Sequence, residues 1–472
     1  MIGLRGFAAL RRSDFRSVLA GAAVYIILTI AVRAFDKEVL TNTRLANLSF
    51  LFIGIYAVGI VLLMRSGKRV RRAVCCILML AVCIELGING YATMSGLNKE
   101  HNFKLRSEYS EKVGKISNAV DYVTENDTGL FRMESTNGAK RTENDGMSFG
   151  FNGMSHYSST YNRKIVDFNR KMGMLQESVL IRYYGSTLIT DSLLDVKYII
   201  SDKAINDNYE EYYSNDKVKV YENPTAVGYG IAAKRSALAD GAYGSVYMEN
   251  QNVFARSLMG RSYVRQQTAR ANGNTLSFVA TGGGSYYVEM PEKYDGDIGI
   301  VRNNIKSAYS YDDTVKKIFY IGDLNNYDSV RLTFKSASAA EKAKIYRVDN
   351  DRFIRDCTEL RENNLKIAKR GRTWLEGTIT LKQDEVLFTS IPYEEGWTAY
   401  VDGQEAEIKC AQNAFLAVDP GEGGHYIRLE YHTPGFAQSE AVSTAALALT
   451  LIFAFRKKLL KLIKNKRIIK KQ

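Results

Sequence analysis

The residues best suited to chemistry gather in one polar stretch between positions 143 and 162. It reads ENDGMSFGFNGMSHYSSTYN, so amide, carboxylate and hydroxyl side chains are interleaved with aromatic rings and three glycines. Such a mixture suits a sugar, because rings stack on its C–H faces while polar groups bond its hydroxyls. The side chains that we expect to bind substrate are Asn144, Asp145, Asn152, Ser155, His156, Tyr157 and Asn162.

A purely structural loop is the alternative explanation for this stretch. Short polar residues favour turns whatever their function, because their side chains bond the neighbouring backbone. The sequence leaves both interpretations open.

No motif for a metal or a nucleophile occurs in the sequence. The four histidines are scattered, and no H-x-x-x-H, H-E-x-x-H, G-x-S-x-G, phosphate-binding loop or G-x-G-x-x-G pattern is present. We therefore predict no protein-encoded metal site. Asp191 and Asp195 could act as an acid and a base, but they bound a short predicted helix, so capping is the simpler role.

Four apolar stretches of 18 to 20 residues predict transmembrane helices at 18–35, 47–64, 73–91 and 436–455. A helix of that length crosses the roughly 30 Å hydrocarbon core of a bilayer. A signal peptide is the competing interpretation of the first stretch, but no A-x-A cleavage pattern closes it.

The basic residues form three clusters beside these stretches. Residues 1–16, 65–72 and 456–472 carry about +3, +5 and +9, which together exceed the net charge of +13. Basic flanks stay on the cytoplasmic side, so we expect both termini inside the cell and a large domain outside it. Because the rest of the chain is slightly acidic, nucleic acid is excluded as a partner. The tail 456–472 is either a helix lying along anionic lipid or a simple stop-transfer flank.

The 344 residues between Ala92 and Gly435 are too long for a loop and too apolar for disorder. We predict an α/β domain at 95–230 and a β-sandwich or jelly-roll region at 231–435, interrupted by a helix at 350–364. The first three membrane helices occupy residues 1–94, and the last helix with its tail occupies residues 436–472. Predicted helices are 108–125, 160–172 and 191–195, and predicted strands are 130–134, 196–200, 217–221, 275–280, 286–290, 317–321, 329–334, 378–381, 386–391, 397–401, 405–409, 414–418 and 426–431.

Cysteine usage implies no disulfide framework. Cys75, Cys76 and Cys83 lie in an apolar stretch, where thiols pack as small apolar groups. Cys357 and Cys410 lie outside the membrane stretches, and they either pair or remain two separate thiols.

Several stretches resemble the C-terminal half of the YfhO family of bacterial multi-spanning membrane proteins. They are IELGINGYATM (84–94), FGFNGMSHYSSTYNRKIVDF (149–168), DSLLDVKYIIS (191–201), KVYENPTAVGYG (219–230), LFTSIPYEEGWTAYVDGQ (387–404) and YHTPGF (431–436). The resemblance implies a GT-C-type glycosyltransferase that moves a sugar from a polyprenyl-phosphate donor to an envelope polymer such as lipoteichoic acid. It also implies a divalent metal, Mg²⁺ or Mn²⁺, and membrane lipid as a partner.

This chain departs from the family in its number of membrane helices. Full-length members carry about a dozen spans before the outer domain, whereas three are predicted before it here. The family's acidic catalytic residue lies in the first outer loop, for which this chain offers Asp36 and Glu38. We expect instead that the catalytic loop belongs to a separate N-terminal membrane half. A non-catalytic, membrane-anchored glycan-binding or scaffold protein is the alternative function.

Overall fold

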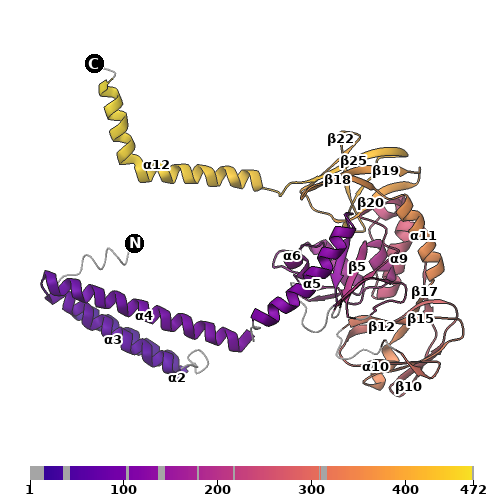
Figure 1. The fold of residues 1–472 in the computed structure, drawn as a ribbon, viewed down its shortest axis with the longest axis horizontal. Coiled ribbons are helices and arrows are strands. Elements are labelled where there is room, and N and C mark those ends of the chain that lie inside the picture. The colour runs from indigo at the N-terminus through magenta and orange to yellow at the C-terminus, as the bar shows by residue number, and fades with distance from the viewer. Residues whose placement is uncertain are drawn as a thin grey trace. The chain divides into compact units, whose positions relative to one another are not determined.

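Long helices form at all four predicted membrane stretches in the computed structural model, which describes residues 15–35, 43–101, 106–136, 144–177, 180–202, 204–215, 218–307, 309 and 316–469. The helices are α2 (Phe15–Phe35), α3 (Thr43–Arg65), α4 (Lys68–His101) and α12 (Phe436–Ile469). The chain divides into two compact units, Met1–Ser110 and Glu111–Gln472 (Figure 1).

Three of these helices contain segments long and apolar enough to cross a membrane: Asn47–Arg65, Arg69–Leu97 and Phe436–Arg456. In α2 the apolar segment Leu19–Leu28 is shorter, so the described residues support three of the four predicted spans. Glu85, the one charge in the predicted 73–91 span, accepts a 2.5 Å hydrogen bond from the Tyr56 hydroxyl of α3. A partnered carboxyl is what an apolar surrounding requires.

The second unit begins with a helix packed on a mixed sheet. Helix α5 (Arg106–Asn126) buries Ile116 and Val123 against Met133 and Tyr198 of the sheet. The sheet order is β1-β5-β7-β6, in which β1 and β5 are parallel and the other pairs antiparallel. The strands are β1 (Arg132–Ser135), β5 (Val196–Ser201), β6 (Glu210–Asn215) and β7 (Val218–Glu222).

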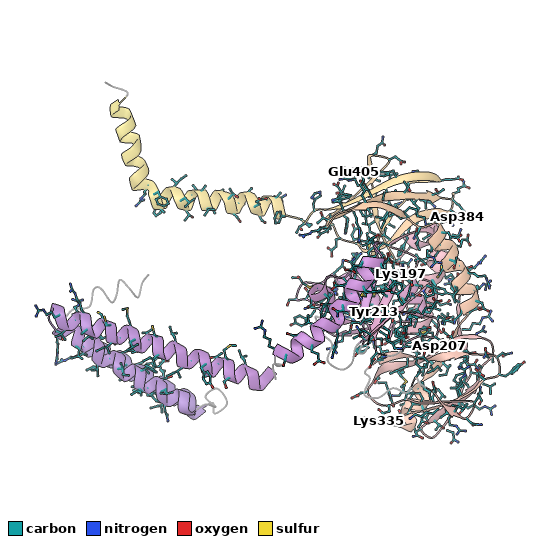
Figure 2. The ribbon with its side chains drawn as sticks, viewed as in Figure 1. Lys197, Asp207, Tyr213, Lys335, Asp384 and Glu405 are labelled. Atoms are coloured by element: carbon teal, nitrogen blue, oxygen red, sulfur yellow. The ribbon has the colours of Figure 1, made fainter. Side chains whose placement is uncertain are left out.

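Polar and aromatic contacts also join α5 and the residue after it to this sheet. Lys197 of β5 forms a 2.6 Å ion pair with Asp127, just beyond α5. The ring of Tyr213 on β6 lies 4.5 Å from that of Tyr122 on α5 (Figure 2). Between β1 and β5 the chain forms α6 (Asp145–Phe149), β2 (His156–Tyr157), α7 (Arg163–Lys171), β3 (Leu175–Glu177), β4 (Leu180–Arg182) and α8 (Leu188–Leu193).

The β-rich part contains two pairs of sheets with separate cores, at opposite ends of this unit (Figure 1). The first pair is β10-β11-β16-β13-β14 against β15-β12-β17-β9, around Leu276, Val288 and Leu332. Its elements are β9 (Val264–Gln267), β10 (Arg270–Asn272), β11 (Thr275–Val279), β12 (Gly284–Tyr294), β13 (Gly299–Arg302), β14 (Ile305–Lys306), β15 (Lys316–Leu324), β16 (Ser329–Thr333), α10 (Ala337–Lys342) and β17 (Lys344–Val348).

The second pair is β18-β19-β25-β21-β22 against β23-β24-β20-β8, around Leu387, Leu416 and Leu429. Its strands are β8 (Gly230–Lys234), β18 (Lys366–Arg370), β19 (Trp374–Leu381), β20 (Glu385–Pro392), β21 (Trp397–Val401), β22 (Gln404–Ala406), β23 (Ile408–Ala411), β24 (Phe415–Val418) and β25 (Gly423–Tyr431). The predicted domain boundary at 230/231 stays a prediction, and β8 pairs with β20 across it.

A central core joins the mixed sheet to both sheet pairs. It is built by α7, α8, α9 (Tyr247–Met259) and α11 (Asn350–Glu362). The faces of β8, β12, β20 and β24 that point away from the cores of the two sheet pairs complete it. Four phenylalanine rings meet there: the Phe168 ring lies 5.0 Å from Phe254 and 4.7 Å from Phe415, which lies 5.5 Å from Phe388.

Most predicted elements exist, with shifted ends. The helices predicted at 108–125 and 350–364 are confirmed as α5 and α11. The strand predicted at 405–409 is wrong as one element, because β22 pairs with β21 and β23 with β24. Helix α9 was not predicted, since its buried set includes the polar residues Asn250 and Gln251 and so lacks a clean apolar periodicity.

We predict that Phe254→Ala destabilises the second unit by about 3–5 kcal/mol, because Phe254 is fully buried among aromatic rings. The thermal unfolding of the detergent-solubilised chain, followed by the near-UV circular dichroism of its tyrosines, measures this loss. Val279→Ala is the control: its side chain is 52% exposed, so the expected change is below about 0.5 kcal/mol. Equal losses would contradict the central role of this core.

Candidate functional site

Part of the polar stretch 144–162 shapes its own loop. The side-chain oxygen of Asn144 accepts a 2.9 Å hydrogen bond from the backbone N–H of Tyr157. The side-chain oxygen of Asn162 caps α7 by accepting from the N–H groups of Lys164 and Ile165. Its amide also donates to the carbonyl of Tyr393 at 2.8 Å. Asn144 and Asn162 therefore act as structural residues in this loop.

The centre of the loop is anchored on a buried carboxylate. Glu134 of β1 is 1% exposed, and one of its oxygens accepts from the backbone N–H groups of Met154 and Ser155. Its other oxygen accepts a 2.8 Å hydrogen bond from the Ser155 hydroxyl, which in turn accepts from the N–H of Tyr183. Because a buried charge is costly without partners, these bonds hold the backbone at 154–155 in place.

A cavity of about 430 Å³ opens beside this anchored segment. That volume falls within the range of small-ligand sites, which combine apolar walls with a few placed polar groups. The lining residues come from β1, the loop, α6, α7, α8, β8, β20 and β24: Arg132, Gly146, Met147, Phe151, Asn152, Gly153, Met154, Ser155, His156, Ile165, Asn169, Leu194, Tyr229, Ser390, Pro392 and Phe415.

Arg132 is the charged group of the cavity wall. It is 8% exposed and donates to the Leu194 carbonyl at 2.5 Å, the Ser390 hydroxyl at 2.7 Å and the Ser390 carbonyl at 2.8 Å. Its guanidinium lies 4.4 Å from the centre of the Tyr229 ring. The guanidinium is therefore held over an aromatic face by neutral acceptors, which pre-orients it for a polar or anionic ligand.

Three of the seven predicted substrate-binding residues line this cavity: Asn152, Ser155 and His156. The His156 ring nitrogen Nδ1 lies 3.1 Å from the Met154 carbonyl, which fixes the ring beside the cavity. Asp145 is buried, and Tyr157 is 52% exposed; neither is among the lining residues. Asp36 and Glu38 lie outside the described residues.

Sequence reasoning missed Arg132, Tyr229 and Ser390. Arg132 lies in the predicted strand 130–134, where a cation among apolar residues was a usable signal. Tyr229 and Ser390 lie inside stretches that resemble the family, but nothing local marks them as site residues. They meet only because β1, the segment before β8 and the end of β20 converge in the fold.

Asp191 and Asp195 are buried groups next to this region, and the capping role predicted for Asp191 is wrong. Asp191 lies inside α8, whose N-cap is Thr187, and it accepts hydrogen bonds from the hydroxyls of Tyr183 (2.7 Å) and Tyr209 (2.5 Å). Asp195 accepts a 2.9 Å hydrogen bond from the N–H of Gly228. Burial raises the pKa of both carboxyls to about 7, although these hydrogen bonds, and the charge of Arg132 for Asp195, act in the opposite direction.

The part of the chain that the structure describes contains neither a metal-binding cluster nor a disulfide bond. No group of three or more His, Cys, Asp or Glu residues could hold a metal ion there. Cys357 is buried and Cys410 half-buried, and both are free thiols, so the pairing left open by the sequence is not formed.

We predict that the second unit loses stability as the pH rises from about 4 to 7. Asp191 and Asp195 have a pKa of about 7 in the fold against an ordinary 3.8, so the folded state binds more protons between these values. Each group then costs on the order of 4 kcal/mol once the pH exceeds 7. Unfolding temperatures measured across this range should decline for the native chain.

Asp191→Asn and Asp195→Asn test the assignment, because an amide imitates the protonated carboxyl. Each variant should flatten the decline by about half, and the double variant should nearly abolish it. An unchanged slope in the double variant would show that other groups cause the pH dependence.

Three comparisons with known proteins are informative to different degrees. The sequence model of the family described as "Bacterial membrane protein YfhO" matches residues 1–443. A Bacillus subtilis (strain 168) protein, described as uncharacterized protein YfhO, is 24% identical over 388 residues, which cover 71% of this chain and 44% of that protein. This chain therefore spans less than half the length of that relative.

A solved structure of a conserved protein of unknown function from Pseudomonas aeruginosa PAO1 is also similar in part. It is 13% identical, and the match covers 34% of this chain and 74% of that one, with a TM-score of 0.13. A likeness at that score supports no conclusion about fold or function.

Proposed function

This chain belongs to the YfhO family of bacterial membrane proteins, and we propose that it is the outer-domain part of an extracytoplasmic glycosyltransferase. The reaction moves a sugar from a polyprenyl-phosphate donor to a cell-envelope polymer such as lipoteichoic acid. Because the chain spans 44% of its relative, a second, N-terminal membrane half supplies the catalytic loop in this proposal.

The orientation in this proposal rests on the basic segment 65–72 between α3 and α4. Retention of this segment on the cytoplasmic side would deliver the chain after α4 to the outside, whether or not α2 also spans the bilayer. The apolar residues of α12 between Phe436 and Phe455 are exposed, as lipid contact requires, and the basic residues from Arg456 onward would return to the inside.

The cavity beside Glu134 is the observation that carries the proposal. It places the Tyr229 and Phe151 rings near an amide, a hydroxyl and an imidazole from Asn152, Ser155 and His156. Aromatic faces next to fixed polar groups are what a sugar needs. We assign this cavity to a sugar unit of the acceptor polymer or of the donor.

Within this chain the proposed role of these residues is binding and positioning rather than bond breaking. The described residues offer no donor set for the divalent metal that the family resemblance implies, so no step through a metal is assigned to them. An outer-loop carboxylate would deprotonate the acceptor hydroxyl, and Asp36 and Glu38 are the candidates that this chain itself carries. Arg132 would hold a polar or anionic substituent of the ligand against Tyr229.

A non-catalytic glycan-binding or scaffold protein is the second candidate function. The observation that favours it is the lining of the cavity, in which the described residues supply aromatic rings, an amide, a hydroxyl and an imidazole but no carboxylate that could act as a base. In that case the same cavity holds the polymer without transferring sugar.

We predict that His156→Ala and Asn152→Ala each lower polymer glycosylation about tenfold, because each removes a polar group from the cavity wall. The measurement is the sugar-to-phosphate ratio of the envelope polymer in cells that carry each variant in place of the native gene. Tyr157→Ala is the matched control, since this exposed neighbour does not line the cavity.

Membrane levels of each variant, measured by immunoblot, must equal those of the native chain for the comparison to hold. Deletion of the gene separates the two functions. Loss of the sugar supports a transferase, whereas unchanged decoration with retained polymer binding supports the binding protein.

A further inference from the structure

Three cations lie in one straight row across the sheet β10-β11-β16-β13-β14. Arg270 of β10 lies opposite Ser277 of β11, and Ser277 lies opposite Arg331 of β16. Continuing across the sheet, Arg331 lies opposite Val301 of β13, and Val301 lies opposite Lys306 of β14. Since neighbouring strands are about 4.8 Å apart, the cations recur roughly every 10 Å. We call Arg270, Arg331 and Lys306 the cation row.

The row lies on the outer face of this sheet. Leu276 is next to Ser277 in β11, Leu332 is next to Arg331 in β16, and both leucines are buried in the core. Because successive side chains of a strand point to opposite faces, the side chains of the row point away from the core. Arg270, Lys306 and Arg331 are all exposed. The other outward positions of these strands hold Ser, Thr, Asn, Val and Gly, without a carboxylate or an aromatic ring.

A shallow hollow of about 400 Å³ follows part of the row. Arg270 and Arg331 line it together with the polar side chains of Ser277, Ser329 and Asn304 and with apolar side chains such as Val279. None of the three row cations forms an ion pair within 4.0 Å with a carboxylate that the structure describes. The charges of this face are therefore available to a ligand.

We propose that this face binds a linear polymer whose repeating units carry phosphodiester groups. Charge complementarity requires an anionic partner, and a row of evenly spaced cations fits a chain of anions better than one compact ion. Two of the three cations are arginines, whose planar forks bond phosphate oxygens in pairs. The neighbouring hydroxyls suit the oxygen-rich groups between the phosphates.

Two other polyanionic partners fit this face less well. Single-stranded nucleic acid is held by aromatic rings that stack on its bases, and no outward position of these strands carries such a ring. A membrane surface favours large apolar side chains beside the cations, whereas the residues between the cations here are the small Ser277 and Val301.

This site is separate from the cavity beside Glu134, and it deepens the proposed function on which it rests, because a teichoic acid is itself a polymer of phosphodiester-linked units. Its residues belong to the 264–348 sheet pair, whereas the cavity is lined by residues 132–229 and 390–415. Polymer held along this face would serve a transferase and a binding protein equally. If the chain transferred no sugar, the proposal that this face binds a phosphodiester polymer would therefore still stand.

The test uses the full chain in neutral detergent micelles with long-chain inorganic polyphosphate as the probe. Substituting Arg270→Gln, Lys306→Gln and Arg331→Gln together should weaken polyphosphate binding at least tenfold. It should also make the dependence of log K on log salt concentration less steep by about 2, as expected for three lost phosphate contacts. Surface Gln substitutions leave the core unchanged, which the near-UV circular dichroism verifies.

A second triple variant controls for net charge, because the basic loop and tail also attract polyanions. Arg265→Gln, Lys342→Gln and Lys344→Gln remove the same three charges from exposed positions elsewhere in this sheet pair. The control should weaken binding less than about threefold. Equal weakening by both variants would overturn the proposal, since net charge alone would then explain binding.

Chemical modification of the native chain gives an independent, local measurement. Polyphosphate should slow the reaction of phenylglyoxal with Arg270 and Arg331, read by mass spectrometry, but not its reaction with Arg265. Equal protection of all three arginines would contradict the proposal. Binding to phosphatidylglycerol vesicles is measured as well. If the first triple variant lost vesicle binding but kept polyphosphate binding, the face would be a membrane-facing surface instead.

Discussion

The site depends on the buried Glu134 carboxylate, whose hydrogen bonds tie the loop 152–156 to strand β1. A carboxylate that is 1% exposed is tolerated only where donors surround it, and here the loop supplies them. The same strand carries Arg132, which is held against Tyr229 and Ser390. One short strand thus fixes both the polar edge and the charged wall of the cavity.

Strand β1 can carry these charges because hydrogen bonds from neighbouring segments satisfy them. It pairs in parallel with β5, and the segment after α8 leads directly into that strand. A hydrogen-bonded series runs from Glu134 through Ser155 to the backbone of Tyr183, whose hydroxyl bonds Asp191. Buried polar networks of this kind are stable only when their members are satisfied together, so they specify one arrangement of the loop.

The fold separates three tasks in space. The helices α3, α4 and α12 provide apolar surface for a membrane. Residues of β1, α7, β20 and β24, together with Tyr229 just before β8, form a cavity, and the 264–348 sheet pair presents a row of cations on its outer face. The central aromatic core around Phe254 and Phe415 connects these regions of the second unit.

The sequence by itself determined three apolar helices long enough to cross a membrane, most strands and the family, because these depend on local composition and periodicity. It also predicted Asn152, Ser155 and His156 from the chemistry of one stretch. Only the tertiary structure decided that Arg132, Tyr229 and Ser390 complete that cavity and that Arg270, Arg331 and Lys306 form a row. Sheet register and the packing of distant segments set these arrangements, and no local pattern in a sequence encodes which strands become neighbours.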